Sequence, residues 1–190
     1  MMKSKKIGDM HQAERYLFTS ERLGFRNWME SDLEKMYEIS SDPEVMEYFP
    51  AIQTRKQTSD FIQRMQNQFK KNGFCYFAVE KLEDQAFIGF IGLAETSFQA
   101  FFTPCIDMGW RLHKSSWYQG YATEGAKRCL DYAFEVLGLS SVMAIAPEIN
   151  LKSQRVMEKA GMKKVLSFKH PLLKDDSRLE DCVLYEIQRP

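Results

Sequence analysis

Apolar residues recur along the chain with two different spacings, and these spacings predict which segments form strands and which form helices. Alternation by two, or a short apolar run between turn residues, predicts strands at 17–28, 74–79, 87–93, 106–112, 141–146, 164–168 and 181–188. Spacing by three and four predicts helices at about 31–41, 54–72, 121–137 and 150–160. The order β-α-α-β-β-β-α-β-α-β-β predicts an α/β (α+β) fold in which one mixed sheet carries helices on its faces.

Capping residues mark where these helices begin. Ser31, followed three residues later by Glu34, has the pattern of a capping box for the first helix. Either Thr54 or Thr58 caps the second, and Asn150 caps the last. With 190 residues and no internal repeat or low-complexity linker, the chain predicts a flexible, polar segment at 1–15 and a single domain at 16–190.

The composition narrows the classes of partner and location. Twenty-six basic and 26 acidic side chains cancel, so no overall field attracts nucleic acid or an anionic membrane surface, and we expect neither partner. No apolar run approaches the roughly 18 residues that span a bilayer, and the first twenty residues lack the apolar segment of a signal peptide. The four cysteines are scattered and the three histidines show no metal-ligand spacing, so we expect no metal site. These features predict a cytoplasmic protein.

The head of the third helix contains little side-chain volume. Gly120 and Ala122 flank its first residue, and Gly125 follows one turn later. Helix N-termini present unpaired N–H groups that bind anions, and small residues allow a phosphate to approach them. A tight turn with close packing of helix against sheet explains the same residues. The segment is neither a P-loop nor a dinucleotide-binding fingerprint, because the required lysine and glycines are missing.

The flanking residues distinguish these two interpretations. The loop reads Trp-Tyr-Gln-Gly-Tyr-Ala-Thr-Glu over 117–124, the preceding strand reads Asp-Met-Gly-Trp-Arg-Leu over 107–112, and Asn150-x-x-Ser153 opens the later helix. These motifs resemble those of the GNAT superfamily of N-acetyltransferases, most closely its RimJ/RimL-like branch, over residues 18–188. The resemblance implies a mostly antiparallel sheet with about four flanking helices and a splayed central pair of strands. Tyr118 departs from the branch, which usually has glycine there.

The resemblance also implies acetyl-CoA as co-substrate and assigns the residues that bind it. The pantetheine arm would follow the strand, and the pyrophosphate would lie on the amides of the loop. The implied cofactor-binding residues are Met108, Gly109, Trp110, Arg111, Leu112, Trp117, Tyr118, Gln119, Gly120, Tyr121, Ala122, Thr123, Asn150 and Ser153.

Direct transfer to an amine requires the amine to be neutral, and this requirement points to a base. Asp107 is the candidate, although an aspartate of ordinary pKa, about 3.9, is a poor base unless burial raises its pKa. The branch more often has glutamate here, and a structural role at the strand edge explains the aspartate equally well. By resemblance, Ser153 protonates the leaving thiolate; a hydroxyl that bonds to the backbone of the first helical turn is the alternative.

The acceptor is less defined. By resemblance, Tyr48 and Phe49 border the acceptor site together with Asp107, whereas Phe98, Phe101 and Phe102 either line it or pack beneath a loop. Acidic residues nearby would favour a polycationic acceptor, and they are Glu30, Asp32, Glu44 and Glu47. We expect either a protein N-terminal α-amine or a small-molecule amine as acceptor, and, by resemblance, a homodimer. The alternative function is a non-catalytic acyl-CoA-binding or interaction domain on the same fold.

Overall fold

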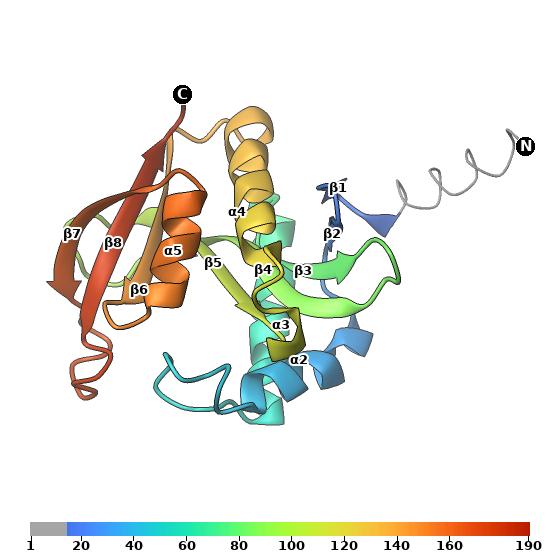
Figure 1. Cartoon of the computed structure of the whole chain (residues 1–190), viewed down its shortest axis with the longest axis horizontal. Helices are drawn as coiled ribbons and strands as arrows, with labels where there is room; N and C mark the ends of the chain where they lie inside the picture. The colour runs from blue at the N-terminus through green and yellow to red at the C-terminus, as the bar shows by residue number, and fades with distance from the viewer. Residues whose placement is uncertain (1–14) are drawn as a thin grey trace, which may run out of the picture.

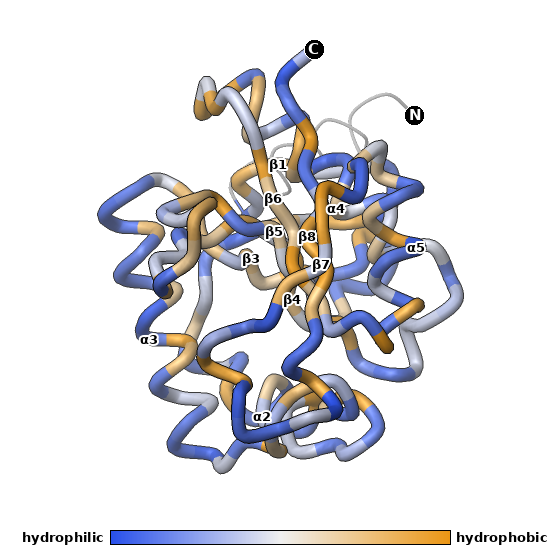
Figure 2. Tube along the Cα trace, turned by 90° about the vertical axis from the view of Figure 1, so that its left-hand side faces the viewer, coloured by the Kyte–Doolittle hydropathy of each residue, from blue (hydrophilic) through white to orange (hydrophobic). Residues whose placement is uncertain are grey.

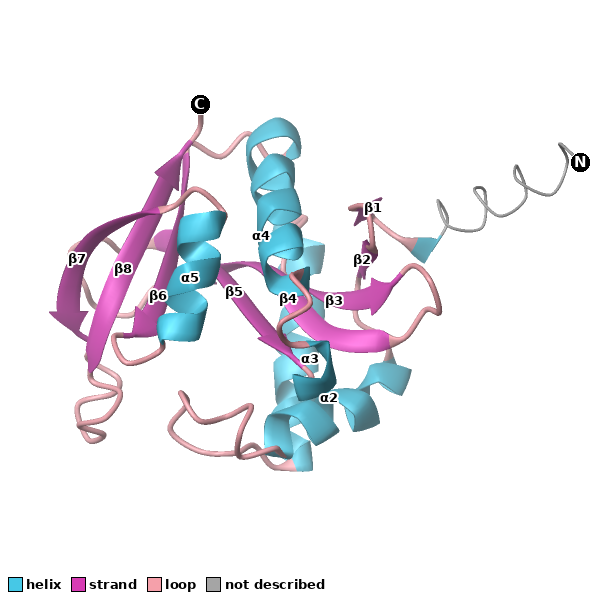
Figure 3. Cartoon of the chain, in the orientation of Figure 1, coloured by secondary structure: helices cyan, strands magenta, loops and turns pink. Residues whose placement is uncertain are grey.

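The structure is a computed structural model that describes residues 15–190. These residues form one eight-stranded sheet in the order β1-β2-β3-β4-β5-β6-β8-β7 (Figure 3). The strands are β1 Phe18–Thr19, β2 Leu23–Arg26, β3 Tyr76–Lys81, β4 Phe87–Thr96, β5 Cys105–Leu112, β6 Ser141–Pro147, β7 Lys163–Lys169 and β8 Asp181–Gln188. The flanking α-helices are α2 Leu33–Ser41, α3 Arg55–Asn72, α4 Tyr121–Asp131 and α5 Leu151–Lys159.

The predicted fold class and the splayed strand pair are both confirmed. Every neighbouring pair of strands is antiparallel except β5 and β6, which run parallel and share a single pair of residues, Asp107 and Met143. From Met108 to Leu112, β5 therefore has a strand partner on its β4 side alone. The two halves of the sheet separate beside β5 in Figure 1.

Helices cover both faces of the sheet. Helices α4 and α5 contact each other and pack over β4, β5 and β6 on one face, whereas α2 and α3 pack together on the other (Figure 1). Gly125 allows α4 to approach closely, because a Cβ atom there would lie 2.3 Å from the Ile91 side chain. On the opposite face, the rings of Trp28, Phe61 and Phe90 pack against one another. Figure 2 shows the hydrophobic segments gathered on the central strands and the hydrophilic ones on the outer turns of the helices.

Three predicted boundaries change in detail. The single strand expected at 17–28 is a hairpin, because Ser20 and Leu23 pair across a tight turn. Ser31 does not cap the first helix; a 3-10 turn precedes that helix, and the Asp32 carboxylate accepts the Met29 amide. Thr54 rather than Thr58 caps α3, accepting the amide of Gln57.

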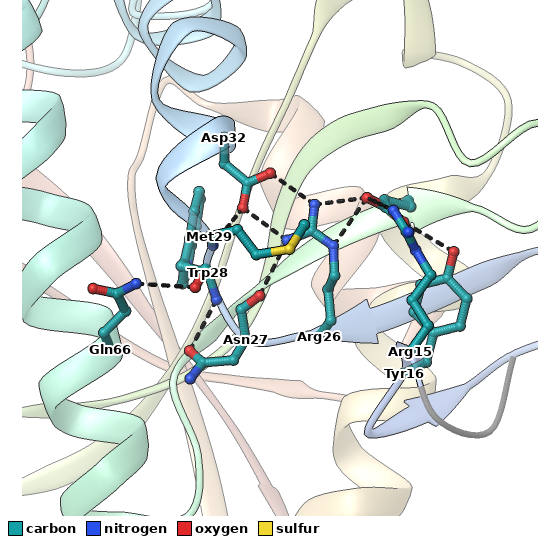
Figure 4. A network of polar contacts seen from close by, with 9 residues as sticks. Arg15, Tyr16, Arg26, Asn27, Trp28, Met29, Asp32 and Gln66 are labelled. Carbon is teal, nitrogen blue, oxygen red and sulfur yellow. Dashed lines mark hydrogen bonds and ion pairs between the residues drawn. The ribbon is translucent and has the colours of Figure 1, made fainter. Parts of the chain in front are cut away.

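A network of buried charges joins the first strands to α2 (Figure 4). The guanidinium of Arg26 donates two 2.7 Å bonds to Asp32 and also pairs with Glu80 on β3, 2.6 Å away. Arg15 and Tyr16 donate to the same Glu80 carboxylate. These bonds pair the charged groups of the network with one another and hold the start of the domain against the sheet.

The predicted boundaries of the domain remain predictions. Of the segment 1–15 that we expected to be flexible, residues 1–14 lie outside the described residues, and residue 15 takes part in the network above. No helix within residues 15–190 has the length and apolar character needed to cross a membrane. Within the same residues, no three His, Cys, Asp or Glu side chains gather in a metal-binding arrangement.

Candidate active site

The first turn of α4 leaves backbone amides free. Its first helical hydrogen bond joins the Glu124 amide to the Gly120 carbonyl, and no described side chain caps the helix. The amides of residues 121–123 therefore have no backbone acceptor within the described residues. Gly120 has φ +83°, a left-handed conformation that favours glycine, and the space beside its Cα is open apart from Arg22. Such a turn offers N–H groups and a partial positive charge to an anion.

The loop before α4 is tied to the β1–β2 turn. Arg22 donates through Nε to the Glu124 carboxylate at 2.7 Å and through Nη1 to the Gln119 carbonyl at 3.0 Å. Ser20 adds a 2.6 Å bond to Glu124. Glu124 thus holds the loop in place. Tyr118, which stands where the branch usually has glycine, has φ +60°, so its backbone adopts the conformation that a glycine permits.

A cavity of about 450 Å³ opens between this helix head, the free edge of β5, α5 and the loop after α2. It brings together most of the predicted cofactor-binding residues with Tyr48 and Phe49. Its lining residues are Glu44, Val45, Tyr48, Phe49, Trp110, Arg111, Leu112, Ser116, Trp117, Tyr118, Gly120, Tyr121, Ala122, Thr123, Asn150, Lys152, Ser153, Arg155, Val156 and Lys159. Because Trp110 and Arg111 point to opposite faces of β5, the cavity reaches around the unpaired edge of that strand.

Four predicted site residues lie outside the cavity lining. Met108 is 2% exposed in the core, and Gln119 uses its side-chain amide to donate to the Ser115 carbonyl. Gly109 lies beneath the ring of Tyr76, where a Cβ atom would come within 2.9 Å of the ring. Asp107, the fourth, stands where β5 and β6 separate.

The environment of Asp107 raises its pKa. The Tyr76 hydroxyl donates a 2.5 Å hydrogen bond to Oδ2, and Gly109 leaves the space through which the tyrosine ring reaches it. Oδ1 is buried and has no hydrogen-bond partner among the described residues. Burial raises the pKa of Asp107 to about 7, and the Tyr76 hydrogen bond opposes that rise. A carboxyl with this pKa can exchange a proton near neutral pH.

Asn150 and Ser153 lie together at the start of α5. Asn150 is the N-cap, as predicted, and its Oδ1 accepts the Ser153 amide at 3.1 Å. The Ser153 hydroxyl lines the cavity and makes no hydrogen bond to another described residue. No described contact therefore supports the alternative, in which this hydroxyl bonds to the backbone of the first helical turn.

Arg111 is buried beside Phe49, and no described residue forms an ion pair with it. Its guanidinium stands 4.2 Å from the centre of the Phe49 ring and 5.5 Å from that of Phe90. Nη1 donates to the Ser40 hydroxyl at 3.1 Å, and Nε is buried with no partner among the described residues. Burial lowers the pKa of Arg111 to about 10, so the side chain remains charged at neutral pH.

Sequence reasoning missed Tyr76 and three cations of α5. Lys152, Arg155 and Lys159 line the cavity from one side of the helix. Their spacing by three and four, directly after Asn150, was the available signal. Tyr76 gave no such signal, because its contact with Asp107 depends on the register of β3, β4 and β5.

Of the four acidic residues that would favour a polycationic acceptor, one lines the cavity in the part of the chain that the structure describes. Asp32 is buried in the ion pair with Arg26, and Glu30 and Glu47 do not line the cavity. Glu44 does line it and lies 3.7 Å from the Lys114 ammonium.

The phenylalanines between β4 and β5 also lie away from the cavity. Phe98 packs against His170, and Phe102 packs against Phe168, which places these rings over β7 and the loop that follows it. Phe101 contacts Phe102 and is 78% exposed. Packing beneath a loop therefore describes Phe98 and Phe102, whereas Phe101 is mostly exposed.

Known proteins resemble this chain in sequence and structure. A family model described as "Acetyltransferase (GNAT) domain" matches residues 22–163. The "Uncharacterized N-acetyltransferase YnaD" of Bacillus subtilis is 30% identical over 152 residues, which are 80% of this chain and 85% of that protein. A GNAT-family acetyltransferase from Bacillus anthracis is 27% identical, with a TM-score of 0.75 over 90% of this chain and 96% of its own. A spermidine N-acetyltransferase from Vibrio cholerae, solved with CoA and spermine, has a TM-score of 0.70 at 18% identity over 88% of this chain and 95% of its own, which shows the fold alone.

Proposed function

Because the chain belongs to the GNAT acetyltransferase family, we propose that it transfers the acetyl group of acetyl-CoA directly to a primary amine, as a member of the RimJ/RimL-like branch. The observation that carries this proposal is the cavity, in which the free amides of α4 and the unpaired edge of β5 lie together. The first suits a diphosphate and the second suits an extended arm that pairs with a strand.

The phosphate end of the cavity fits the co-substrate. The amides of residues 121–123 face a space that the glycine at 120 keeps open. Lys152, Arg155 and Lys159 add positive charge from α5. This donor set matches the negative charge of phosphate groups, and the same cavity contains no comparable excess of acidic side chains.

Asp107 and Ser153 transfer protons at the acceptor end of the cavity. Acetyl-CoA supplies the activated acetyl thioester. Asp107, with its pKa of about 7, takes the proton from the acceptor amine, through a water because its carboxylate lies outside the cavity lining. Tyr76 is a positioning residue that holds this carboxylate. The Ser153 hydroxyl donates to the departing sulfur, which as a thiolate of a thiol with pKa about 8.5 needs little acid assistance.

Thiol release tests the proposal. We would measure acetyl-CoA consumption against N-terminal peptides, spermidine, aminoglycosides and lysine-like amines. Asp107→Asn should lower kcat by about a hundredfold or more, because a positioned base contributes 10²–10⁴-fold. Ser153→Ala should lower it by about tenfold or less, since the thiolate leaves readily.

The location of Asp107 outside the cavity lining also favours a second candidate, the non-catalytic acyl-CoA-binding domain. Calorimetric binding of acetyl-CoA with no thiol release for any amine would support that candidate. Failure to bind acetyl-CoA would contradict both. A homodimer and a cytoplasmic location stay proposals, and sedimentation velocity tests the first.

A further inference from the structure

The acceptor end of the cavity contains a cation that no residue among 15–190 pairs with a negative charge. Arg111 is 7% exposed, and no described carboxylate lies within ion-pair distance of it. The Ser40 hydroxyl is the single hydrogen-bond partner that its guanidinium has among the described residues, and the buried Nε has none. A buried charge without a partner is costly, so such groups are normally paired or serve a ligand.

The neighbours of Arg111 place it at the acceptor end. The ring of Phe49, in the loop predicted to border the acceptor, is centred 4.2 Å from the guanidinium, and the ring of Phe90, its neighbour on β4, is centred 5.5 Å away. Both rings hold the side chain in one orientation without neutralising it. A guanidinium fixed between rings, with free N–H groups, suits a planar carboxylate.

The charge of the cavity agrees with this assignment. Arg111, Lys152, Arg155 and Lys159 are its cationic side chains, and Glu44 is its one acidic side chain among the described residues. The three cations of α5 lie on the helix whose start carries Ser153, whereas Arg111 comes from β5 beside Phe49. With the three α5 cations assigned to the phosphates of the co-substrate, Arg111 is the cation left for the acceptor, and a cationic group brought beside it would meet like charge.

We infer that Arg111 is a specificity-determining residue, and that the acceptor is a primary amine that carries a carboxylate in the same molecule. This inference rests on the proposed acetyl transfer for its assignment of the amine. Asp107 and Arg111 lie four residues apart on one face of β5, so their Cα atoms are about 13 Å apart. That spacing is too long for the two side chains to neutralise each other, and the Tyr76 ring covers the strand face between them at Gly109. The carboxylate of the acceptor would therefore meet Arg111 in the cavity, and its amine would reach Asp107 through the water proposed above.

The test compares matched acceptors that differ only in the anion. ω-Amino carboxylates of increasing chain length, and N-terminal peptides with an acidic second or third residue, would be paired with their amides. Calorimetry in the presence of CoA would give binding constants, and thiol release would give kcat/KM. The wild type should favour the carboxylate by roughly 10- to 100-fold in one of the two series, as expected for a charge-assisted hydrogen bond.

Variants then assign the preference to one side chain. Arg111→Gln should remove the preference and leave the KM for acetyl-CoA within about twofold, and Arg111→Lys should keep part of it, because a lysine retains the charge without the planar fork. Arg64→Gln is the matched control, since Arg64 also lies over a phenylalanine ring but belongs to the exposed surface of α3.

The outcomes separate the two proposals. Equal binding and turnover of carboxylates and amides by the wild type would overturn the role of Arg111 and leave acetyl transfer standing, and a preference for spermidine would do the same. A carboxylate preference in binding without any thiol release would support the anion site and overturn acetyl transfer. A rise in the KM for acetyl-CoA in Arg111→Gln, with the acceptor preference unchanged, would reassign Arg111 to the co-substrate and overturn the inference.

Discussion

Arg26 on β2 and Arg111 on β5 are buried to similar depths, with exposed fractions of 4% and 7%, yet their surroundings are opposite. Arg26 meets two carboxylates, those of Asp32 and Glu80, and its remaining N–H capacity goes to the Asn27 carbonyl. These partners outweigh burial and raise the pKa of Arg26. Arg111 meets one hydroxyl and two aromatic rings, and burial lowers its pKa to about 10.

The same contrast separates the carboxylates of the two regions. Glu80 is surrounded by Arg15, Tyr16 and Arg26, so its pKa is lowered in spite of burial. Among the described side chains, Asp107 accepts a hydrogen bond from the Tyr76 hydroxyl and has no cationic partner, and burial raises its pKa to about 7. Charges that satisfy one another stabilise a fold, whereas charges left under-paired beside a cavity are available to a ligand or a proton.

The largest expected effect comes from removing one arginine of each kind. Arg26→Met should lower the free energy of unfolding by about 3–5 kcal/mol, because it leaves the Asp32 carboxylate buried without its cationic partner and removes one of the two arginines that pair with Glu80. Arg111→Met, the matched change, should cost no more than about 1 kcal/mol or should stabilise, since it replaces an unpaired charge with an apolar side chain between two rings. Urea denaturation of both variants measures the difference. Equal losses would mean that Arg111 is as much a structural residue as Arg26.

The two carboxylates should respond to pH with opposite signs. Glu80 has a lowered pKa, so its contribution to stability is present above its unfolded pKa of about 4.5 and is lost as pH falls through the folded value. Asp107 binds its proton more tightly in the folded state, so stability is lost as pH rises from the ordinary aspartate pKa of 3.8 through about 7. Relative to wild type, Asp107→Asn should therefore gain stability between pH 4 and pH 8. Glu80→Gln should be most destabilising at neutral pH and approach wild type in acid. Thermal melts across this range measure both effects, and a stability difference between Asp107→Asn and wild type that does not change with pH would contradict a raised pKa.

The smallest expected effect concerns Tyr118, which lines the cavity. Tyr118 has φ +60° and is 86% exposed, so Tyr118→Gly should raise the free energy of unfolding by about 0.5–1 kcal/mol by relieving a left-handed conformation. Gln85→Gly is the control, because Gln85 has φ +57° in a turn away from the cavity. Both variants should gain stability, and Tyr118→Gly alone should change the KM for acetyl-CoA. If Gln85→Gly gains and Tyr118→Gly loses, the Tyr118 ring makes contacts that exceed its backbone strain.

Local patterns predicted much of this protein. The periodicity of apolar residues located the four flanking helices. Thr54, Gly120 and Asn150 stand at the starts of three of them, and these starts were predictable because each depends on a few residues that are neighbours in the sequence. The sequence did not distinguish the roles of the two glycines at the head of α4, and the structure does. Gly120 forms the left-handed turn, whereas Gly125 makes room for Ile91 on β4.

Contacts between residues far apart in the chain could not be predicted from the sequence. Ser31 had the pattern of a cap, but Asp32 became the polar centre of that turn because Arg26, across a hairpin, was available to pair with it. The Tyr76–Asp107 bond depends on three strands in register, and the burial of Arg111 depends on a loop folding back over β5. Neither has a signature in the order of residues along the chain.

The single residue pair between β5 and β6 has a mechanical consequence. It makes the sheet two panels, β1 to β5 and β6 to β8, joined by a narrow seam at Asp107 and Met143. A pantetheine arm that pairs with the edge of β5 would act as a partial ninth strand and fasten one panel to the other. The co-substrate would then support the architecture as well as take part in the reaction, adding to the packing of α4 against α5 that already joins the two panels.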